Sequence, residues 1–304
     1  MRSSSRALFQ IHFCVFLWGF TAILGKAITL SALPLVWWRM LIVTGALMLM
    51  PKFWRGFAKT SRRAGAIYLA IGLVVATHWV TFYASIKLSN ASVAATCMAF
   101  TSFFIAFFEP LLMRRAFDVR ELFFGLAVIP GVALVVGGTP AGMRTGLAIG
   151  ALSAFLLAMF GILNKRFIEH GEPLTVTGLE MAAGAGCLTI LGLIHPSSSI
   201  FLLPGRNDAA FLVILAIGCT LAPFALSLVA LRRLTAFTTA LALNMEPVYA
   251  IVLAIAIFGD QQQLKAGFYA GVAIVLAVVF SHPRLLATGS GTAEASHVAA
   301  HPDL

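Results

Sequence analysis

The sequence has too little charge to cover a water-soluble protein of its size. Only 11% of its 304 residues are Asp, Glu, Lys or Arg, whereas 60% are hydrophobic. About a quarter of the residues in an ordinary globular domain are charged. We therefore expect lipid, and not water, to surround most of the surface.

Cysteine is scarce too, and its spacing indicates no chemistry. Cys14, Cys97, Cys187 and Cys219 lie singly inside apolar segments, with no Cys-x-x-Cys spacing and no set of histidines nearby that would complete a metal site. This pattern predicts neither a disulfide framework nor a metal site. We expect the four thiols to be small core residues.

The chain also lacks the short motifs of common catalysts and nucleotide-binding proteins. HExxH, GxSxG and clustered histidines are absent, and the segment from Gly19 to Lys26 has neither the glycine spacing nor the following Ser or Thr of a phosphate-binding loop. We therefore predict that the protein is not an enzyme and uses no cofactor.

The net charge of +10 does not indicate a nucleic-acid partner. The 21 basic residues lie in short clusters between apolar segments and do not form one stripe. Such clusters are typical of the loops of a membrane protein. The lipid bilayer is therefore the expected environment.

Ten apolar segments are long enough to cross a bilayer, which takes about 20 residues for about 30 Å of hydrocarbon. They cover roughly residues 7–28, 33–51, 66–87, 90–113, 120–138, 146–168, 173–195, 209–231, 235–258 and 266–281. Lipid offers the backbone no hydrogen-bond partner, so all should be helices. The predicted fold is an all-α integral membrane protein with ten transmembrane helices.

The basic residues separate between alternate loops. With the N-terminus inside, fifteen of the 21 fall on the inner side and six on the other. This bias predicts that both termini are cytoplasmic. Residues 283–304 are too polar to pack and should form a disordered cytoplasmic tail.

The two halves of the chain resemble each other. At an offset of 139, Lys26 aligns with Lys165 and Pro34 with Pro173. The similarity predicts one five-helix repeat over residues 1–138 and a second over 139–282. Since five is odd, the second repeat must insert upside down. Two inverted repeats can open a midplane site to each side of the membrane in turn.

Several motifs resemble the EamA family of the drug/metabolite transporter superfamily over about residues 7–281. They are Trp18-Gly19 with Lys26, Trp38-Arg39, Asn164-Lys165, Asn244-Met245-Glu246-Pro247-Val248-Tyr249, and Asp260 after the ninth span. The resemblance implies a multi-pass carrier of small metabolites in the bacterial inner membrane, amino acids among them, with export in several cases. Arg114 and Arg115 stand where the family often has an acid, which argues against a paired role for Asp260.

The resemblance also bears on assembly. In the family, the fifth and tenth spans commonly form a structural or dimer face. Gly267 and Gly271 form a GxxxG pattern at the start of the tenth span, which is typical of close helix packing. A homodimer through that face is one option that the resemblance leaves open.

Ionisable groups inside the spans are candidate substrate ligands, because a charge at the centre of a span costs about 2.5 to 3.5 kcal/mol. At 1.5 Å per residue, His78 lies about 18 Å into the third span and Glu246 about 16 Å into the ninth. Arg39 and Glu180 lie only about 10 Å or less along theirs, so snorkelling is an alternative for both.

The predicted substrate-binding residues combine these groups with aromatic and amide neighbours. The set is His78, Trp79, Tyr83, Trp18, Asn244, Glu246, Arg39, Glu180 and Asn164. The alternatives are structural: a hydrogen bond from His78 to a neighbouring helix, and amide bridges between helices for the two asparagines. Pro247 should kink the ninth span.

Three further charged residues near span ends have structural interpretations. Lys26 and Lys165 should anchor the first and sixth spans at the membrane interface. Glu109 should form a local ion pair with Arg114 or Arg115 beside the kink at Pro110.

The predicted function is secondary transport of small metabolites, such as amino acids or related compounds, by alternating access and in the export direction. Protonation of His78 or Glu246 would couple transport to a proton gradient. The alternatives are a drug or cation exporter of the same fold, a passive channel, a membrane-embedded enzyme and a non-transporting partner subunit.

Overall fold

The computed structural model describes residues 2–114, 123, 126–127, 129–167, 171–223, 226 and 245–278. All regular structure in these ranges is helical, as predicted. The main helices are α1 (Arg2–Ala27), α2 (Ala32–Met48), α3 (Pro51–Phe57), α4 (Arg62–Leu88), α5 (Ala91–Ala99), α6 (Thr101–Met113), α8 (Ile129–Gly138), α9 (Arg144–Phe167), α10 (Pro173–Ile194), α11 (Arg206–Val213), the π-helix η4 (Ile214–Leu221), α14 (Glu246–Phe258) and Ala266–Val278.

Five helical segments are long and apolar enough to cross a membrane. They are Arg6–Ala27, Arg62–Leu88, Ala91–Met113, Ala141–Phe167 and Pro173–Ile194, and the pair α2 and α3, bent by 88°, would be a sixth. Three shorter apolar helices, Ile129–Gly138, Glu246–Phe258 and Ala266–Val278, lie in predicted spans that extend beyond the described residues. The protein is therefore a multi-pass membrane protein, and the number of ten spans stays a prediction.

Local sequence explains where several helices begin and end. The Ser61 hydroxyl accepts a hydrogen bond from the Ala64 amide at the start of α4, and the Asn90 side chain accepts one from Val93 at the start of α5. These side chains satisfy amides that have no partner inside the helix. Gly259, in the left-handed conformation with φ of 66°, ends α14.

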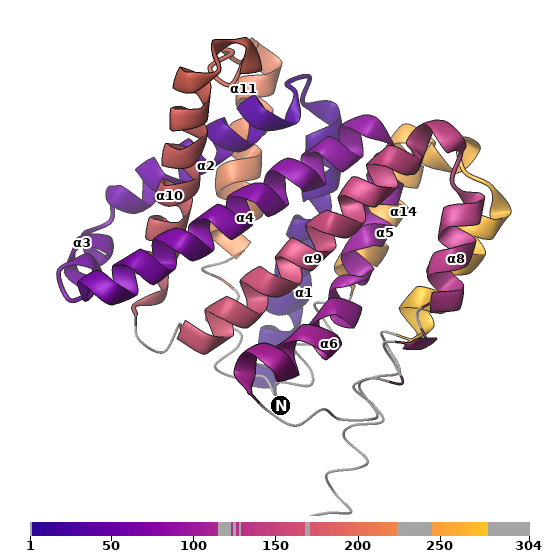
Figure 1. The fold of residues 1–304 in the computed structure, drawn as a ribbon, viewed down its shortest axis with the longest axis horizontal. Helices are drawn as coiled ribbons and strands as arrows, with labels where there is room; N and C mark the ends of the chain where they lie inside the picture. Colours follow the sequence, from indigo (N-terminus) through magenta and orange to yellow (C-terminus); the bar gives the residue numbers. More distant parts are fainter. Residues whose placement is uncertain are drawn as a thin grey trace, which may run out of the picture.

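The centre of the molecule lies between the two halves of the chain (Figure 1). Helix α4 packs along α9 and α10, α2 packs on α10, and α1 packs on α14. Each of these pairs joins a helix from the first half to one from the second. A site in the middle of the bundle is therefore built by both halves.

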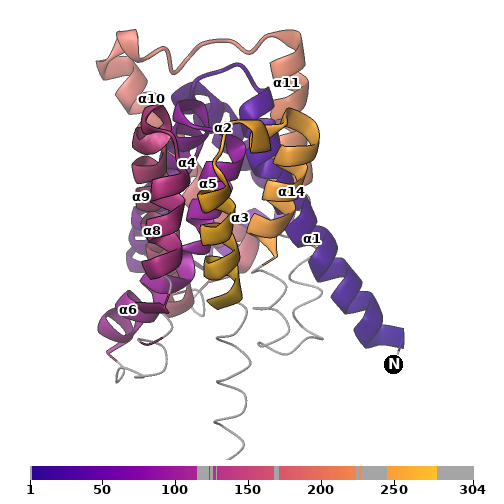
Figure 2. The same cartoon turned by 90° about the vertical axis from the view of Figure 1, so that its right-hand side faces the viewer.

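The bundle has two ends, which we name by the lysines of α1 and α9. At the Lys26 end, α1, α4 and α14 end, and α2, α5 and α9 begin. At the Lys165 end, α6 and α9 end and α10 begins. In Figure 2 the Lys26 end is at the top, near α11, and the first turns of α1 lean away from the bundle at the bottom.

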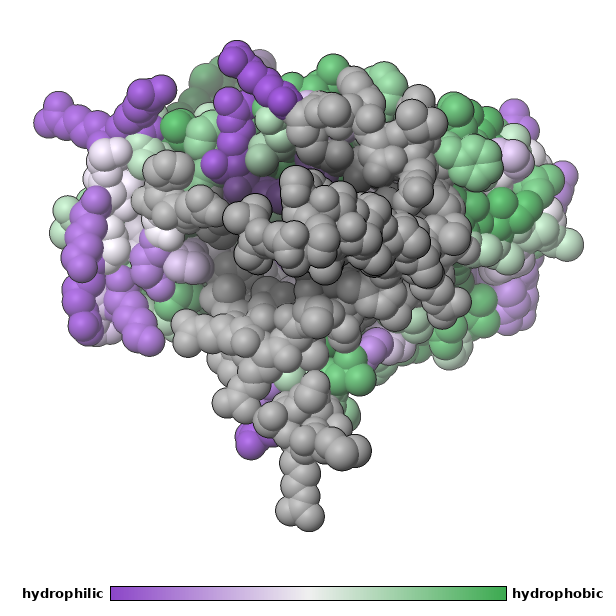
Figure 3. All heavy atoms as spheres, turned by 90° about the horizontal axis from the view of Figure 1, so that it is seen from below, coloured by the Kyte–Doolittle hydropathy of each residue, from purple (hydrophilic) through white to green (hydrophobic). Residues whose placement is uncertain are grey.

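The surface fits a bilayer. Large apolar side chains face outward, with Phe9 72% and Leu193 69% exposed. Exposed basic residues gather on α3, the turn after it and the start of α4: Lys52, Arg55, Lys59, Arg62 and Arg63. Figure 3 shows hydrophilic side chains along the corresponding rim. This band matches one of the predicted basic loops, while the side of the membrane on which it lies stays a prediction.

The glycines of the predicted GxxxG pattern pack within the chain. A Cβ on Gly271 would lie 2.5 Å from the carbonyl oxygen of Gly131, and one on Gly138 would lie 2.1 Å from the amide nitrogen of Phe268. Helices α8 and Ala266–Val278 therefore approach at backbone distance. The predicted close packing is confirmed, and the homodimer stays a prediction.

Candidate functional site

A cavity of about 500 Å³ lies between the two halves. Its walls come from α1, α2, α4, α5, α9, α10, η4 and α14. Seven of the nine predicted residues line it: Trp18, Arg39, His78, Trp79, Asn164, Glu180 and Glu246. Asn244 lies outside the described residues. The cavity thus combines aromatic surface with ionisable groups of both signs.

Arg39 is fixed in the wall and does not snorkel. The residue is only 4% exposed, and its guanidinium carbon lies 3.7 Å from the ring centroid of Trp79. Its Nη1 donates to the Tyr83 hydroxyl at 2.7 Å, and its Nε and Nη2 donate to the Thr220 hydroxyl at 3.1 and 2.7 Å. The snorkelling alternative for Arg39 is therefore wrong.

Tyr83 is not part of the cavity wall. It is fully buried, with 0% exposure, and its hydroxyl accepts the hydrogen bond from Arg39. The sequence predicted that Tyr83 contacts the substrate. The structure gives it a different place, behind Arg39, where it orients the guanidinium. The depth of a residue along a span does not show the direction in which its side chain points.

Thr220 was missed by the sequence analysis. It lies in the π-helix η4, and its hydroxyl donates to the carbonyl of Leu215, five residues earlier, at 2.8 Å. The hydroxyl's lone pairs therefore remain for Arg39. π-Helical turns often occur at functional sites. No residue pattern in this segment announces one, so sequence reasoning had no signal for the role of Thr220.

His78 is both hydrogen-bonded to a neighbouring helix and placed at the cavity. Its Nδ1 lies 2.9 Å from the carbonyl oxygen and 2.9 Å from the hydroxyl of Ser153 in α9. A carbonyl only accepts, so Nδ1 carries the hydrogen in that bond. The residue is only 6% exposed. The two interpretations offered by the sequence are thus compatible.

Glu180 and Asn164 form a second polar group in the cavity. Glu180 is 3% exposed, and its Oε1 has no hydrogen-bond partner in the part of the chain that the structure describes. The Asn164 side chain lies next to this carboxyl. Burying an unpaired polar atom costs free energy, so this oxygen is a candidate ligand for a donor that the cavity admits.

Glu246 is the first residue of α14, with Pro247 in the first helical turn. Proline is well suited to that position because its missing N–H would have no intrahelical partner there. α14 therefore starts at this dipeptide. The predicted kink at Pro247 stays a prediction, because residues 235–244, which precede it in the ninth span, lie outside the described residues. Glu246 is partly exposed toward the cavity.

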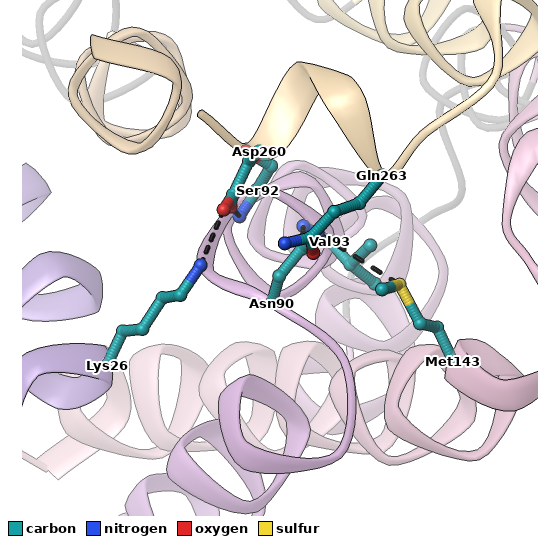
Figure 4. Close-up of polar contacts among 7 residues, drawn as sticks. All are labelled: Lys26, Asn90, Ser92, Val93, Met143, Asp260 and Gln263. Atoms are coloured by element: carbon teal, nitrogen blue, oxygen red, sulfur yellow. Dashed lines mark hydrogen bonds and ion pairs between the residues drawn. The ribbon is translucent and has the colours of Figure 1, made fainter. Parts of the chain in front are cut away.

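The Lys26 end is closed by a polar network (Figure 4). Lys26 pairs with Asp260 at 2.6 Å, and the fully buried Asp260 also accepts a hydrogen bond from the Ser92 amide at 3.1 Å. Asp208 adds a second contact, since it accepts from the amide and hydroxyl of Thr29 at 2.9 and 2.6 Å. Two expectations are wrong here: Lys26 is not a lipid anchor, and Asp260 does have a paired role.

A corresponding ion pair lies at the other end. Lys165 of α9 pairs with Glu109 of α6 at 2.5 Å, with side chains 66% and 13% exposed. This partner of Glu109 is 56 residues away and in the other half of the chain. The predicted local ion pair with Arg114 or Arg115 stays a prediction, because Arg115 lies outside the described residues. Both ion pairs thus join the aligned lysines to an acid of the opposite half.

Comparisons with known proteins agree on a transporter fold. The model of the EamA-like transporter family matches residues 5–137 and again 144–281. A curated relative, the "Uncharacterized transporter YyaM" of Bacillus subtilis (strain 168), is 22% identical over 164 residues, which are 51% of this chain and 54% of that protein. The chain thus matches about half the length of this relative.

A likeness to solved structures supports the fold alone. One crystal structure of a protein superposes with a TM-score of 0.56 over 92% of this chain and 95% of that chain, at 17% sequence identity. The helical arrangement is therefore shared with a known fold.

Proposed function

Because the chain belongs to the EamA-like transporter family, we propose that it is a secondary transporter that exports small metabolites, such as amino acids or related compounds, by alternating access. The observation that carries this proposal is the cavity of about 500 Å³ between the two halves. Small-molecule sites typically occupy about 300 to 1,000 Å³. Family membership supports a carrier over an enzyme.

The duplicated architecture supports alternating access. We propose that residues 1–138 and 139–282 are inverted five-helix repeats in the bacterial inner membrane, with both termini cytoplasmic. Each end of the bundle has an ion pair between the halves. If the halves rock against each other around the cavity, these two contacts must break in turn.

The polar groups of the cavity support a charged or zwitterionic substrate. Arg39 supplies a positive charge, and Glu180 and Glu246 supply carboxyl groups. We also propose that protonation of His78 or Glu246 couples export to inward proton flow, since both line the cavity and titrate. The second candidate function, export of cationic drugs, is favoured by the unpaired Oε1 of Glu180.

Counterflow in proteoliposomes tests the proposal. Vesicles with the purified full-length protein are loaded with one unlabelled L-amino acid at a time, and entry of the same labelled amino acid is followed. A parallel set uses tetraphenylphosphonium and ethidium. We expect saturable counterflow of at least one amino acid. Counterflow of the cations alone would favour the second function, and none with either set would overturn both.

A further inference from the structure

Arg39 has a buried charge that forms no ion pair with any described residue. Its hydrogen-bond partners are two neutral hydroxyls, those of Tyr83 and Thr220, and no described carboxylate is paired with it. Arginine does not lose its proton in proteins. A buried charge without a counter-ion is costly. The site therefore favours a ligand that brings a negative group.

The geometry of Arg39 favours a planar anion. Its three bonds within the protein use three of the five N–H donors of a guanidinium. Trp79 covers one face of the guanidinium plane at 3.7 Å. The two remaining donors belong to the terminal nitrogens, and an arginine fork binds a carboxylate with two parallel bonds.

Glu246 offers the opposite charge in the same cavity. Its carboxylate accepts no hydrogen bond from the described residues and forms no ion pair with Arg39, and both side chains line the same cavity of about 500 Å³. The two groups are thus close enough to act on one small molecule, yet neither satisfies the other. A molecule that has both a carboxylate and an ammonium group would satisfy both.

We infer that Arg39 binds the substrate's carboxylate and Glu246 its ammonium group, so that the cavity selects zwitterions over simple cations. This inference rests on the proposed transport function and decides between its two substrate classes. A cation would leave Arg39 without a counter-ion. Tyr83 is a positioning residue, because it holds the guanidinium from behind Arg39 and does not line the cavity. Thr220 also holds the guanidinium, and it lines the cavity beside Arg39.

A matched series of ligands tests the inference by binding, which does not require transport. The aromatic walls, which include Trp18 and Trp79, suit one phenyl body in all probes: L-phenylalanine, L-phenylalaninamide, phenethylamine and 3-phenylpropionate. Dissociation constants are measured by tryptophan fluorescence on the full-length protein in detergent. We expect L-phenylalanine to bind at least tenfold more tightly than the other three.

Variants then show which side chain recognises the carboxylate of the ligand and which recognises its ammonium group. In Arg39→Gln the preference for L-phenylalanine over its amide should disappear, whereas in Glu246→Gln the preference over 3-phenylpropionate should disappear. Arg39→Lys, which keeps the charge but loses the fork, should retain part of the first preference. Arg144→Gln, at the exposed start of α9, is the matched control and should retain both preferences.

The outcomes separate this inference from the proposed function. Unchanged discrimination in Arg39→Gln, or no binding of any probe to the wild type at millimolar concentration, would overturn the inference. If Arg39→Gln does not fold, the other two variants test the inference in its place. Full discrimination by both Glu246→Gln and Arg39→Lys would then overturn it. Arg39-dependent binding without counterflow would refute transport and leave the site assignment standing. Counterflow without Arg39-dependent selection would support transport and refute the site assignment.

Discussion

Tyr83 does not line the cavity but holds Arg39, which does. Removing the Tyr83 hydroxyl tests this arrangement. Tyr83→Phe removes the acceptor of the 2.7 Å bond from Nη1. Hydrogen bonds to charged groups contribute about 1.5 to 3 kcal/mol, so we expect L-phenylalanine to bind about tenfold or more weakly. In the double variant Arg39→Gln/Tyr83→Phe, binding should be no weaker than in Arg39→Gln alone. If the two losses of binding free energy add up instead, the Tyr83 hydroxyl contacts the substrate directly.

His78 allows a test of proton coupling. His78→Gln keeps a side chain that can donate to the carbonyl of Ser153, but it cannot titrate. If proton flow depends on His78, a pH gradient should accelerate uptake into wild-type proteoliposomes and leave the variant unaffected, while counterflow without a gradient continues in both. Equal stimulation of both proteins would remove His78 from the coupling proposal.

The sequence could predict most of the ionisable cavity residues, because charged groups stand out in apolar helices. It could not identify Thr220 or Thr21, which also line the cavity. Threonines are common in membrane helices, where they often bond to their own backbone. Thr220 lies in the π-helical turns of η4 and meets Arg39, which is 181 residues away in the sequence.

At the scale of helix pairs, adjacent glycines of α8 provide an internal comparison. A Cβ at Gly138 would lie 2.1 Å from the Phe268 amide nitrogen, whereas one at Gly137 would meet nothing within 4 Å. Gly138→Ala should lower the melting temperature, since overpacking costs about 1 to 3 kcal/mol. Gly137→Ala should raise or preserve it, because alanine favours a helix by about 1 kcal/mol. Equal effects would contradict the close packing of α8 on Ala266–Val278.

The two lysines offer a second comparison between elements. Lys26→Met leaves the fully buried Asp260 without its cation, and breaking a buried pair costs about 3 to 5 kcal/mol. Lys165→Met removes a lysine that is 66% exposed, and such pairs contribute about 0 to 1 kcal/mol. Thermal unfolding in detergent should therefore show a large loss for the first variant and a small one for the second.

The difference in burial between the two ion pairs could not be foreseen from the sequence. The repeat aligns the two lysines and suggests equal roles, but their acids come from different positions: Asp260 follows α14, whereas Glu109 lies inside α6. Because the two acids lie at different positions, the two ion pairs also differ in burial: Asp260 is fully buried, whereas Lys165 is 66% exposed. Helix positions and caps follow local rules, whereas ion pairs across the halves depend on how the halves pack.

For the whole molecule, alternating access requires that each end opens during every cycle. A covalent link across one end should therefore stop transport while the cavity still binds its ligand. The Lys26 end offers a suitable site, since Lys26 and Asp260 join α1 to the segment after α14. We expect a bifunctional maleimide on Lys26→Cys/Asp260→Cys, in a background in which the exposed Cys187 is replaced by serine, to abolish counterflow of L-phenylalanine.

The controls separate a locked transporter from a damaged one. The Lys26→Cys variant in the same background, treated with the same reagent, cannot be linked to position 260 and should transport as it does untreated. The linked double variant should still bind L-phenylalanine, because the cavity lies between the halves and not at this end. Continued counterflow after complete linking would show that the Lys26 end stays closed throughout, and rocking of two halves around a central site would then be excluded.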